Sequence, residues 1–428
     1  MYILLFAIFR AFYIPIVMIL FLALPMFFKK SYKARLVKAF ELCGPVLIKF
    51  GQSISLKPYM FSKETIEACS QLQDQVSSIK MNLKKELGDA YEDFTFQDSK
   101  PIASGSIACV FKAKIKKDNS LVAIKILKRN VDKAIKADIL LLENTSRILE
   151  LIPIFKKLKL KAVIQNIKET LLHEINFKNE EENLFKIKSN IFKIYPIAKT
   201  PKVFSEYTKE NILVTEFIEG IPLSNPQKIK NHNIDINKIC KNLIIIYLEQ
   251  VYEDGFFHAD FHPGNLFTDQ YGNITMIDFG IVSSITYEER VCLAKILNGF
   301  LLKDYKKVFQ AHVEGGYIKN TLNEEEFEKD LKKIGESFVH STNVTQFSIS
   351  GILMELFKIM EKYQIEIKEN LLLLYKTIFF VEAVVTKLNP EYNIWHTIKP
   401  WMYNWRDKNL SFVNQIFNQI KKISHLFS

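Results

Sequence analysis

The chain opens with a hydrophobic segment. Residues 11–28 carry no charged side chain and residues 1–9 are apolar as well, so Arg10 interrupts an otherwise uncharged stretch. Eighteen residues are just enough for a membrane-spanning helix, although Pro15 and Pro25 would bend it. We therefore expect residues 1–28 to form a membrane-associated helix. The alternative, which Arg10 favours, is an amphipathic helix buried against the folded protein.

Strand patterns come next. Apolar and β-branched residues predict strands near residues 107–115 and 122–127, and residues 214–220 are typical of a strand that continues into a hinge. The intervening residues 128–173 predict a helical insertion. Residues at helical spacing there are Ile139, Leu142, Thr145, Ile148 and Leu149. This order predicts a small sheet lobe that encloses a helical insertion.

The remainder of the chain is predicted to be mostly helical. Residues 371–385 are strongly apolar, but Lys376 and Glu382 interrupt them, which favours a buried core helix over a membrane span. A terminal helix would carry one apolar face, with Lys421 and Lys422 opposite. That face consists of Phe412, Val413, Ile416, Phe417, Ile420, Ile423 and Phe427. It suits interfacial membrane contact or a partner helix, and packing on the core is the alternative.

Charge and cysteine content narrow the class of protein. The 428 residues include 58 basic and 47 acidic side chains, a formal charge of +11 that suits nucleic acid or an anionic membrane. No aromatic residues interleave with basic ones, so we expect no nucleic acid partner. The basic residues after the hydrophobic segment place the rest of the chain in the cytoplasm. Five cysteines without a C-x-x-C pair fit reduced thiols.

Two short polar segments carry the candidate chemistry. They are His258-Ala-Asp-Phe-His-Pro-Gly-Asn265 and Ile277-Asp-Phe-Gly280. Asp260 and Asn265 are five apart, and Asp278 follows Asn265 by thirteen. Protein-kinase-like enzymes use this order and spacing for a catalytic Asp, a metal-binding Asn and a metal-binding Asp.

The residues between these segments predict a hairpin that turns at residues 271–273. Such a hairpin would return Asp278 beside Asn265, so both oxygen ligands would face one Mg²⁺. The alternative is a polar loop followed by an ordinary Asp-Phe-Gly turn. A zinc site at His258 and His262 lacks a third ligand, and we interpret His258 as a support for the loop.

A phosphate-binding half of the site is predicted upstream. Val122-Ala-Ile-Lys125 describes a strand that points an ammonium group at α- and β-phosphate oxygens, although a lysine at a strand edge is the alternative. The preceding loop has small residues in place of the usual glycines, so backbone amides can still approach phosphates. Its candidate nucleotide-binding residues are Ala103, Ser104, Gly105, Ser106, Ile107, Ala108 and Val110.

Over about residues 40–405 these motifs resemble the UbiB family of atypical kinase-like ATPases, which supports ubiquinone biosynthesis. The resemblance rests on the alanine-rich loop, the H-A-D-x-H-P-G-N loop and a K-x-G-Q motif at Lys49-Phe-Gly-Gln52. It implies that Lys49 and Gln52 are catalytic and that Glu180 pairs with Lys125. Glu143 is the rival partner of Lys125, and Glu180 to Glu182 could instead be a solvated helix start.

Two positions depart from the family pattern. The E-x-D signature is Glu174-Ile-Asn176 here, so the second carboxylate is an amide, which puts any mechanism that needs two acids there in doubt. Gly105 stands where the family most often has alanine, and the extra glycine loosens the loop.

The expected fold class is α+β, a protein-kinase-like two-lobed fold with an N-terminal helical K-x-G-Q extension and a membrane segment. The expected domains are residues 1–28, the membrane-associated helix; 29–88, the K-x-G-Q extension; 89–213, the N-lobe; 214–390, the C-lobe; and 391–428, the tail. ATP or ADP with Mg²⁺ would bind between the lobes, with the adenine on backbone groups near Glu216 to Ile218. Lys125, Asp260, Asn265 and Asp278 would carry out phosphoryl transfer.

The expected function is a membrane-associated atypical kinase or ATPase for ubiquinone biosynthesis, at the bacterial inner membrane with its catalytic part in the cytoplasm. Expected partners are inner-membrane lipids, isoprenoid quinone precursors and other biosynthetic proteins. A small-molecule phosphotransferase and a nucleotide-binding scaffold with negligible turnover are the alternatives. No Ala-Pro-Glu element follows Gly280, so the usual peptide-docking surface is missing from the pattern.

Overall fold

The computed structural model describes residues 2–23, 31–55, 62–69, 72, 81–149, 160–318, 323–339, 349–363, 365 and 368–409. The predicted apolar face at 412–427 lies outside these residues. The chain divides into two compact units, which are described separately. Unit 1 comprises Met1–Asn183 and Pro201–Phe217, and unit 2 comprises Leu184–Thr200 and Ile218–Ser428.

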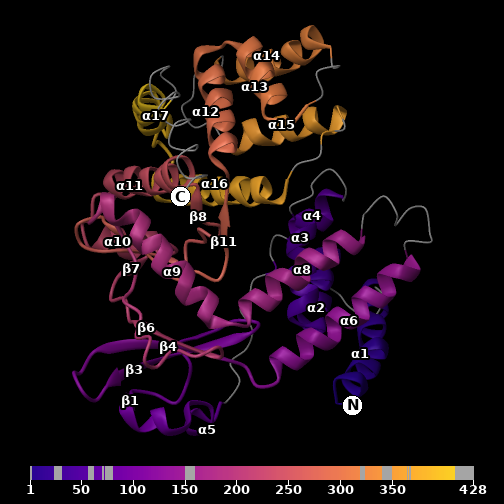
Figure 1. Ribbon diagram of the computed structural model, residues 1–428, viewed down its shortest axis with the longest axis vertical. Coiled ribbons are helices and arrows are strands. Elements are labelled where there is room, and N and C mark those ends of the chain that lie inside the picture. Colours follow the sequence, from indigo (N-terminus) through magenta and orange to yellow (C-terminus); the bar gives the residue numbers. More distant parts are fainter. Residues whose placement is uncertain are drawn as a thin grey trace, which may run out of the picture. The chain divides into compact units, whose positions relative to one another are not determined.

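Helices make up one part of unit 1 (Figure 1). They are α1 (Tyr2–Met18), which continues as a π-helical segment (Ile19–Ala23), α2 (Tyr32–Cys43), α3 (Pro45–Ser55), α4 (Lys63–Cys69), α5 (Leu83–Leu87), α6 (Val131–Leu149) and α8 (Leu160–Glu174). Ser31 caps α2 by accepting a hydrogen bond from the Ala34 amide. Gly44, at φ +93°, ends α2, and Pro45 begins α3, where a missing amide costs nothing.

An antiparallel sheet forms the other part of unit 1. Its strands are β1 (Phe94–Phe96), β2 (Ala103–Ser104), β3 (Ala108–Ile115), β4 (Leu121–Leu127) and β6 (Ile212–Glu216). They follow the order β1-β3-β4-β6, and β2 also pairs with β3. Alternate residues of β4 are buried, including Val122 and Ile124, and they pack with Phe111 of β3 in one hydrophobic core. The two strands predicted from residues 107–115 and 122–127 are therefore present.

Helix α1 is attached to the rest of unit 1 by a buried ion pair. Arg10 Nε and Nη2 each lie 2.6 Å from a carboxylate oxygen of Asp138 on α6, and Nη2 also donates to the Cys43 carbonyl oxygen. Asp138 is 1% exposed. Burial raises the pKa of the Asp138 carboxyl group, and the hydrogen bond from Arg10 opposes that shift. The contact between α1 and α6 is visible in Figure 1.

The predicted N-terminal helix is present over residues 2–23, but a membrane-spanning role for it is not supported. Among the described residues, no helix combines the length and the apolar character that a membrane crossing requires. The alternative interpretation of Arg10, a helix packed on the protein, describes α1, because Arg10 and Val17 are buried. Four large apolar side chains nevertheless remain exposed on this segment: Phe12, Ile16, Ile19 and Leu20.

Gly51 allows α3 to pack closely on its neighbours. A Cβ atom at this position would lie 2.6 Å from a ring carbon of Phe40 and 2.3 Å from a methyl carbon of Leu72, both of which are buried. We expect Gly51→Ala to destabilise the protein by about 1–3 kcal/mol, because overpacking outweighs the better helix propensity of alanine. Urea denaturation would measure the change. A more stable Gly51→Ala variant would contradict the close packing.

Unit 2 is mainly helical. Its helices are the end of α9 (Phe177–Ile191), α10 (Pro226–Asn231), α11 (Ile236–Leu248), α12 (Tyr287–Leu302), α13 (Tyr305–Glu314), α14 (Glu324–Val339), α15 (Ile349–Lys362), α16 (Glu369–Leu388) and α17 (Trp395–Asn409). Its strands are β5 (Ala198–Lys199), β7 (Ile221–Pro222), β8 (Phe256–His258), β9 (Leu266–Thr268), β10 (Ile274–Met276) and β11 (Val282–Ser284). A π-helical segment (Glu249–Asp254) leads from α11 toward β8.

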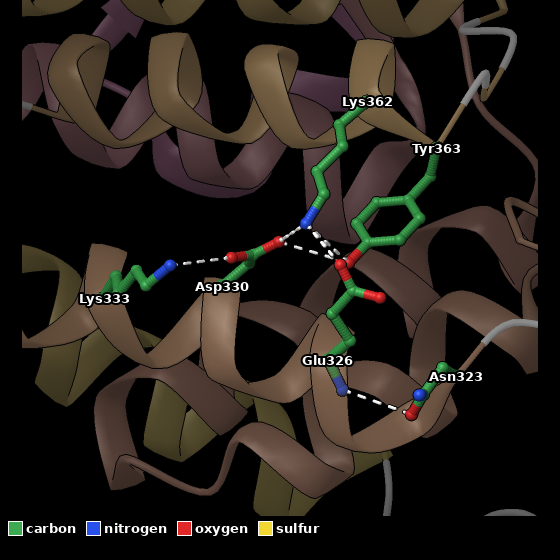
Figure 2. Close-up of polar contacts among 6 residues, drawn as sticks. All are labelled: Asn323, Glu326, Asp330, Lys333, Lys362 and Tyr363. Carbon is green, nitrogen blue, oxygen red and sulfur yellow. Dashed lines mark hydrogen bonds and ion pairs between the residues drawn. The ribbon is translucent and has the colours of Figure 1, made fainter.

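A polar network joins α14 to α15 (Figure 2). The Asp330 carboxylate accepts hydrogen bonds from Lys362 at 2.6 Å, from Lys333 at 3.1 Å and from the Tyr363 hydroxyl group at 3.1 Å. These hydrogen bonds lower the pKa of Asp330, and the bond from Lys362 has the largest effect. The apolar sides of the same helices meet around Phe327 and Leu331. The network therefore links α14 to the end of α15, beside the apolar contact between the same two helices.

Candidate active site

The catalytic segment of unit 2 folds as a strand, a loop and a hairpin. β8 ends at His258, the loop carries Asp260 and Asn265, and β9 and β10 then pair antiparallel with Leu266 opposite Met276. Gly272, at φ +76°, lies in the turn. The Ile277 amide donates to the Asn265 carbonyl oxygen at 2.9 Å, so the predicted hairpin does bring the chain back beside Asn265, one residue before Asp278.

His258 holds this loop in shape. Its Nδ1 accepts a hydrogen bond from the Asp260 amide at 3.0 Å, while Nε2 lies 3.1 Å from the Ile277 carbonyl oxygen. That pair of contacts fits the neutral imidazole with its proton on Nε2. Burial lowers the pKa of His258, which keeps the ring neutral. Among the described residues no group of three candidate metal ligands of the His, Cys, Asp or Glu type is present. His258 therefore acts as the support that the sequence indicated.

Asp260 and Asn265 contact each other directly. Asn265 Nδ2 lies 3.2 Å from Asp260 Oδ2 and 3.3 Å from the Asp260 carbonyl oxygen. Because the amide nitrogen is turned toward Asp260, Oδ1 is the atom of Asn265 that suits a hard cation. The contact also fixes the orientation of the Asp260 carboxylate.

Asp278 has an unusual backbone conformation. Its φ is +60°, in the left-handed region that non-glycine residues rarely adopt, and its side chain is exposed. Oδ1 accepts a hydrogen bond from the Gly280 amide at 3.3 Å. The next residue, Phe279, is fully buried and its ring lies 5.2 Å from that of His258. Strained backbone of this kind is concentrated at functional sites, because surrounding structure must hold it in place. An exposed carboxylate anchored in this way fits the role of a metal ligand.

Unit 1 carries the predicted lysine–glutamate pair. Lys125 Nζ, on β4, lies 2.9 and 3.1 Å from the two carboxylate oxygens of Glu180, on α9. Glu180 is 5% exposed, so it is not part of a solvated helix start. Glu143, the rival partner, instead accepts a hydrogen bond from Lys168 at 2.9 Å. The structure therefore selects Glu180.

A second ion pair involves the K-x-G-Q motif. Lys49 Nζ, on α3, lies 2.6 Å from Glu174 Oε1 at the end of α8, and both side chains are 8% exposed. Asn176 Oδ1 accepts a hydrogen bond from the Lys178 amide at 3.0 Å, so the amide that replaces the family's carboxylate caps the start of α9. The Gln52 side chain lies outside the described part of the structure.

The candidate phosphate-binding loop is a tight hairpin. β2 and β3 pair with Ala103 opposite Val110, and the Gly105 amide donates to the Ala108 carbonyl oxygen at 2.8 Å, which places Ser106 and Ile107 at the tip. Lys128 Nζ donates to the Gly105 carbonyl oxygen, a contact that the sequence did not indicate. Burial lowers the pKa of Lys128.

The predicted adenine contacts need refinement. The Glu216 amide donates to the Lys202 carbonyl oxygen at 2.8 Å, and the Phe217 amide donates to the Leu121 carbonyl oxygen at 3.0 Å. These two amides are therefore engaged within unit 1. Ile218 is the first residue of the following segment of unit 2. The contact of an adenine base with backbone groups near Glu216 to Ile218 stays a prediction.

Lys376 is a site residue that the sequence pattern did not identify. It lies on α16, far from the motifs in sequence, and its Nζ is 3.1 Å from Asp260 Oδ1. The one lysine within the apolar residues 371–385 was the signal that the sequence offered.

Comparisons with known proteins agree with this geometry. Residues 67–312 match an ABC1 atypical kinase-like domain, and residues 331–393 match a UbiB helical domain. "Probable protein kinase UbiB" of Erwinia tasmaniensis is 32% identical over 386 residues, which cover 87% of this chain and 70% of that protein. The protein of the same name from Enterobacter is 31% identical, with the same coverage.

A solved structure shares the fold. The Rv3197–erythromycin complex from Mycobacterium tuberculosis has a TM-score of 0.53 and 19% sequence identity, with 89% of this chain and 94% of that chain covered. This likeness supports the kinase-like fold alone. The match of the kinase-like domain over more than half of the chain, together with the identity to its relatives, shows that the chain belongs to the UbiB family of atypical kinase-like proteins.

Proposed function

We propose that this protein is a membrane-associated atypical kinase or ATPase that supports ubiquinone biosynthesis, acting on lipid precursors or on other biosynthetic proteins. The observation that carries the proposal is the arrangement of Asp260, Asn265 and Asp278 around one loop and hairpin. The Lys125–Glu180 ion pair supports it from unit 1. Relatives named as probable protein kinases add further support.

Each polar group has a defined part in this proposal. Asn265 Oδ1 and the Asp278 carboxylate would hold Mg²⁺, which neutralises phosphate charge when it is bound. Lys125, oriented by Glu180, would bind phosphate oxygens, and the backbone at the loop tip, Ser106 and Ile107, would approach them. Asp260 would orient a hydroxyl group or a water molecule, or accept its proton. Positioning and charge neutralisation supply most of the catalysis in phosphoryl transfer, so these groups suffice chemically.

Membrane association is proposed from α1 and its π-helical continuation. Phe12, Ile16, Ile19 and Leu20 are exposed while Arg10 and Val17 are buried, so this segment holds to unit 1 on one side and presents apolar side chains on another. That arrangement suits a helix lying in the interface of a lipid bilayer. We propose the bacterial inner membrane as the site, with the catalytic groups facing the cytoplasm.

Deletion of the gene tests the functional proposal. We expect ubiquinone to be lost and an early prenylated precursor to accumulate, both measured by quinone profiling, because the pathway would lack its ATP-dependent component. The wild-type gene should restore ubiquinone, whereas an Asp278→Asn gene should not. A deletion strain with a normal quinone profile would count against the proposal.

The two alternative functions predict different results. A small-molecule phosphotransferase would leave the quinone profile intact and transfer phosphate to a soluble acceptor. A scaffold with negligible turnover would be restored by the Asp278→Asn gene. The ion pairs at Lys125 and at Lys49 favour a working site over a scaffold, because apolar side chains can often replace a buried ion pair without loss of stability.

A further inference from the structure

Lys376 stands out within its helix. Residues 371–385 of α16 include two charged side chains, Lys376 and Glu382. Glu382 Oε1 accepts a hydrogen bond from the Ile349 amide at 2.8 Å, at the first residue of α15, so its place is explained by the packing of two helices. The ammonium group of Lys376 instead forms an ion pair with Asp260, outside the helices. It reaches the catalytic loop.

Lys376 and Asn265 hold the two oxygens of the Asp260 carboxylate. Lys376 Nζ lies 3.1 Å from Oδ1, and Asn265 Nδ2 lies 3.2 Å from Oδ2. Each carboxylate oxygen therefore accepts a hydrogen bond from a different part of unit 2. The two side chains of the ion pair are 26% and 27% exposed, so the pair is partly shielded from water while the site stays accessible. Charge-assisted hydrogen bonds in such surroundings are stronger than those on an open surface.

The lysine is itself held by aromatic packing. Its ammonium group lies 5.4 Å from the centre of the Phe380 ring, one helical turn further along α16, and Phe380 packs edge-on against His262 of the catalytic loop with ring centres 5.9 Å apart. Leu374 and Val381 of the same helix are buried. A helix anchored in this way can fix the position of a side chain better than a loop can.

We propose that Lys376 is a positioning residue for phosphoryl transfer, and this inference rests on the proposed function. It holds the Asp260 carboxylate in one orientation, from which the carboxylate can meet the acceptor hydroxyl group or water. Its positive charge also offsets the negative charge that Asp260, Asp278 and the nucleotide phosphates bring together. Lys376 falls in the region that matches the UbiB helical domain, whereas Asp260 falls in the ABC1 atypical kinase-like match. The helical region therefore contributes directly to the catalytic site.

Three variants of the full chain test this role. We expect Lys376→Met to lower kcat for MgATP hydrolysis by about 10- to 100-fold, with a Kd for MgATP that changes by less than about twofold, because Asp260 is misplaced while the nucleotide ligands remain. Lys376→Arg keeps the charge and the donor, and should recover a large part of kcat. Lys387→Met removes the same charge from an exposed position on the same helix and should leave kcat unchanged.

Thermal denaturation of Lys376→Met, Asp260→Asn and the double variant measures the ion pair itself. The shifts in Tm should be non-additive if the two side chains are coupled.

The outcomes separate the two proposals. If the wild-type protein is active and Lys376→Met has the same kcat, the role of Lys376 is overturned and the proposed function stands. Additive shifts in Tm would overturn the contact. A wild-type protein that neither hydrolyses ATP nor transfers its phosphate would refute the proposed function, and non-additive shifts would still support Lys376 as the residue that positions Asp260.

Discussion

Asp278→Asn is expected to lower ATP hydrolysis by about a hundredfold or more, because the substitution removes the anionic ligand that the proposed Mg²⁺ site depends on. Asparagine is nearly the same size as aspartate and tolerates the left-handed backbone conformation, here φ +60°. It can also still accept the hydrogen bond from the Gly280 amide. The loss of activity can then be assigned to charge rather than to a change of fold.

The measurement is steady-state ATP hydrolysis in the presence of lipid vesicles, with the Mg²⁺ concentration varied. Asp407→Asn is the matched control, since it makes the same chemical change at an exposed position of α17 in the same unit. We expect Asp407→Asn to keep wild-type activity. Hydrolysis that persists in Asp278→Asn would show that the metal ligands have been assigned to the wrong residues.

Arg10→Met is expected to lower the free energy of unfolding by about 3–5 kcal/mol, because it leaves the Asp138 carboxylate buried without its partner. Asp138 is 1% exposed, and both of its oxygens accept hydrogen bonds from Arg10. Burial raises the pKa of Asp138. The carboxyl group therefore binds a proton more readily in the folded protein than in the unfolded chain. Stability from this source is present at low pH and is lost as the pH rises through the folded pKa.

Urea denaturation at two pH values measures both effects, and the loss in Arg10→Met should be larger at pH 8 than near pH 5. Replacing both partners, in Arg10→Met with Asp138→Leu, should restore much of the stability, since no buried charge is then left unpaired. Lys136→Met, at an exposed position of α6, is the control for loss of a single positive charge. A double variant as unstable as Arg10→Met would mean that the ion pair does not account for the loss.

Local sequence patterns predicted the strands and the hairpin, because these elements depend on residues that are neighbours in the chain. The strands near residues 107–115 and 122–127 and the hairpin after Asn265 follow from alternation and turn residues, which act over a few neighbours. The spacing of Asp260, Asn265 and Asp278 indicated kinase-like chemistry, because a loop and a hairpin of fixed length determine where such side chains can lie. His258 could be interpreted as a support for the loop because it lies at the start of the same loop of fixed length.

Local sequence patterns could not predict contacts between segments that are far apart in the chain. The sequence left Glu143 and Glu180 as rival partners of Lys125, and it interpreted Arg10 as an interruption of a membrane segment and Lys376 as an interruption of a core helix. In each of these cases the partner lies more than fifty residues away, on another helix or in the catalytic loop. Charged side chains are placed by the few oppositely charged groups that the fold brings within about 3 Å, a property of the whole fold that no local pattern encodes. The sequence by itself therefore determined the family and the chemical groups of the site, while the tertiary structure decided which charges pair with one another.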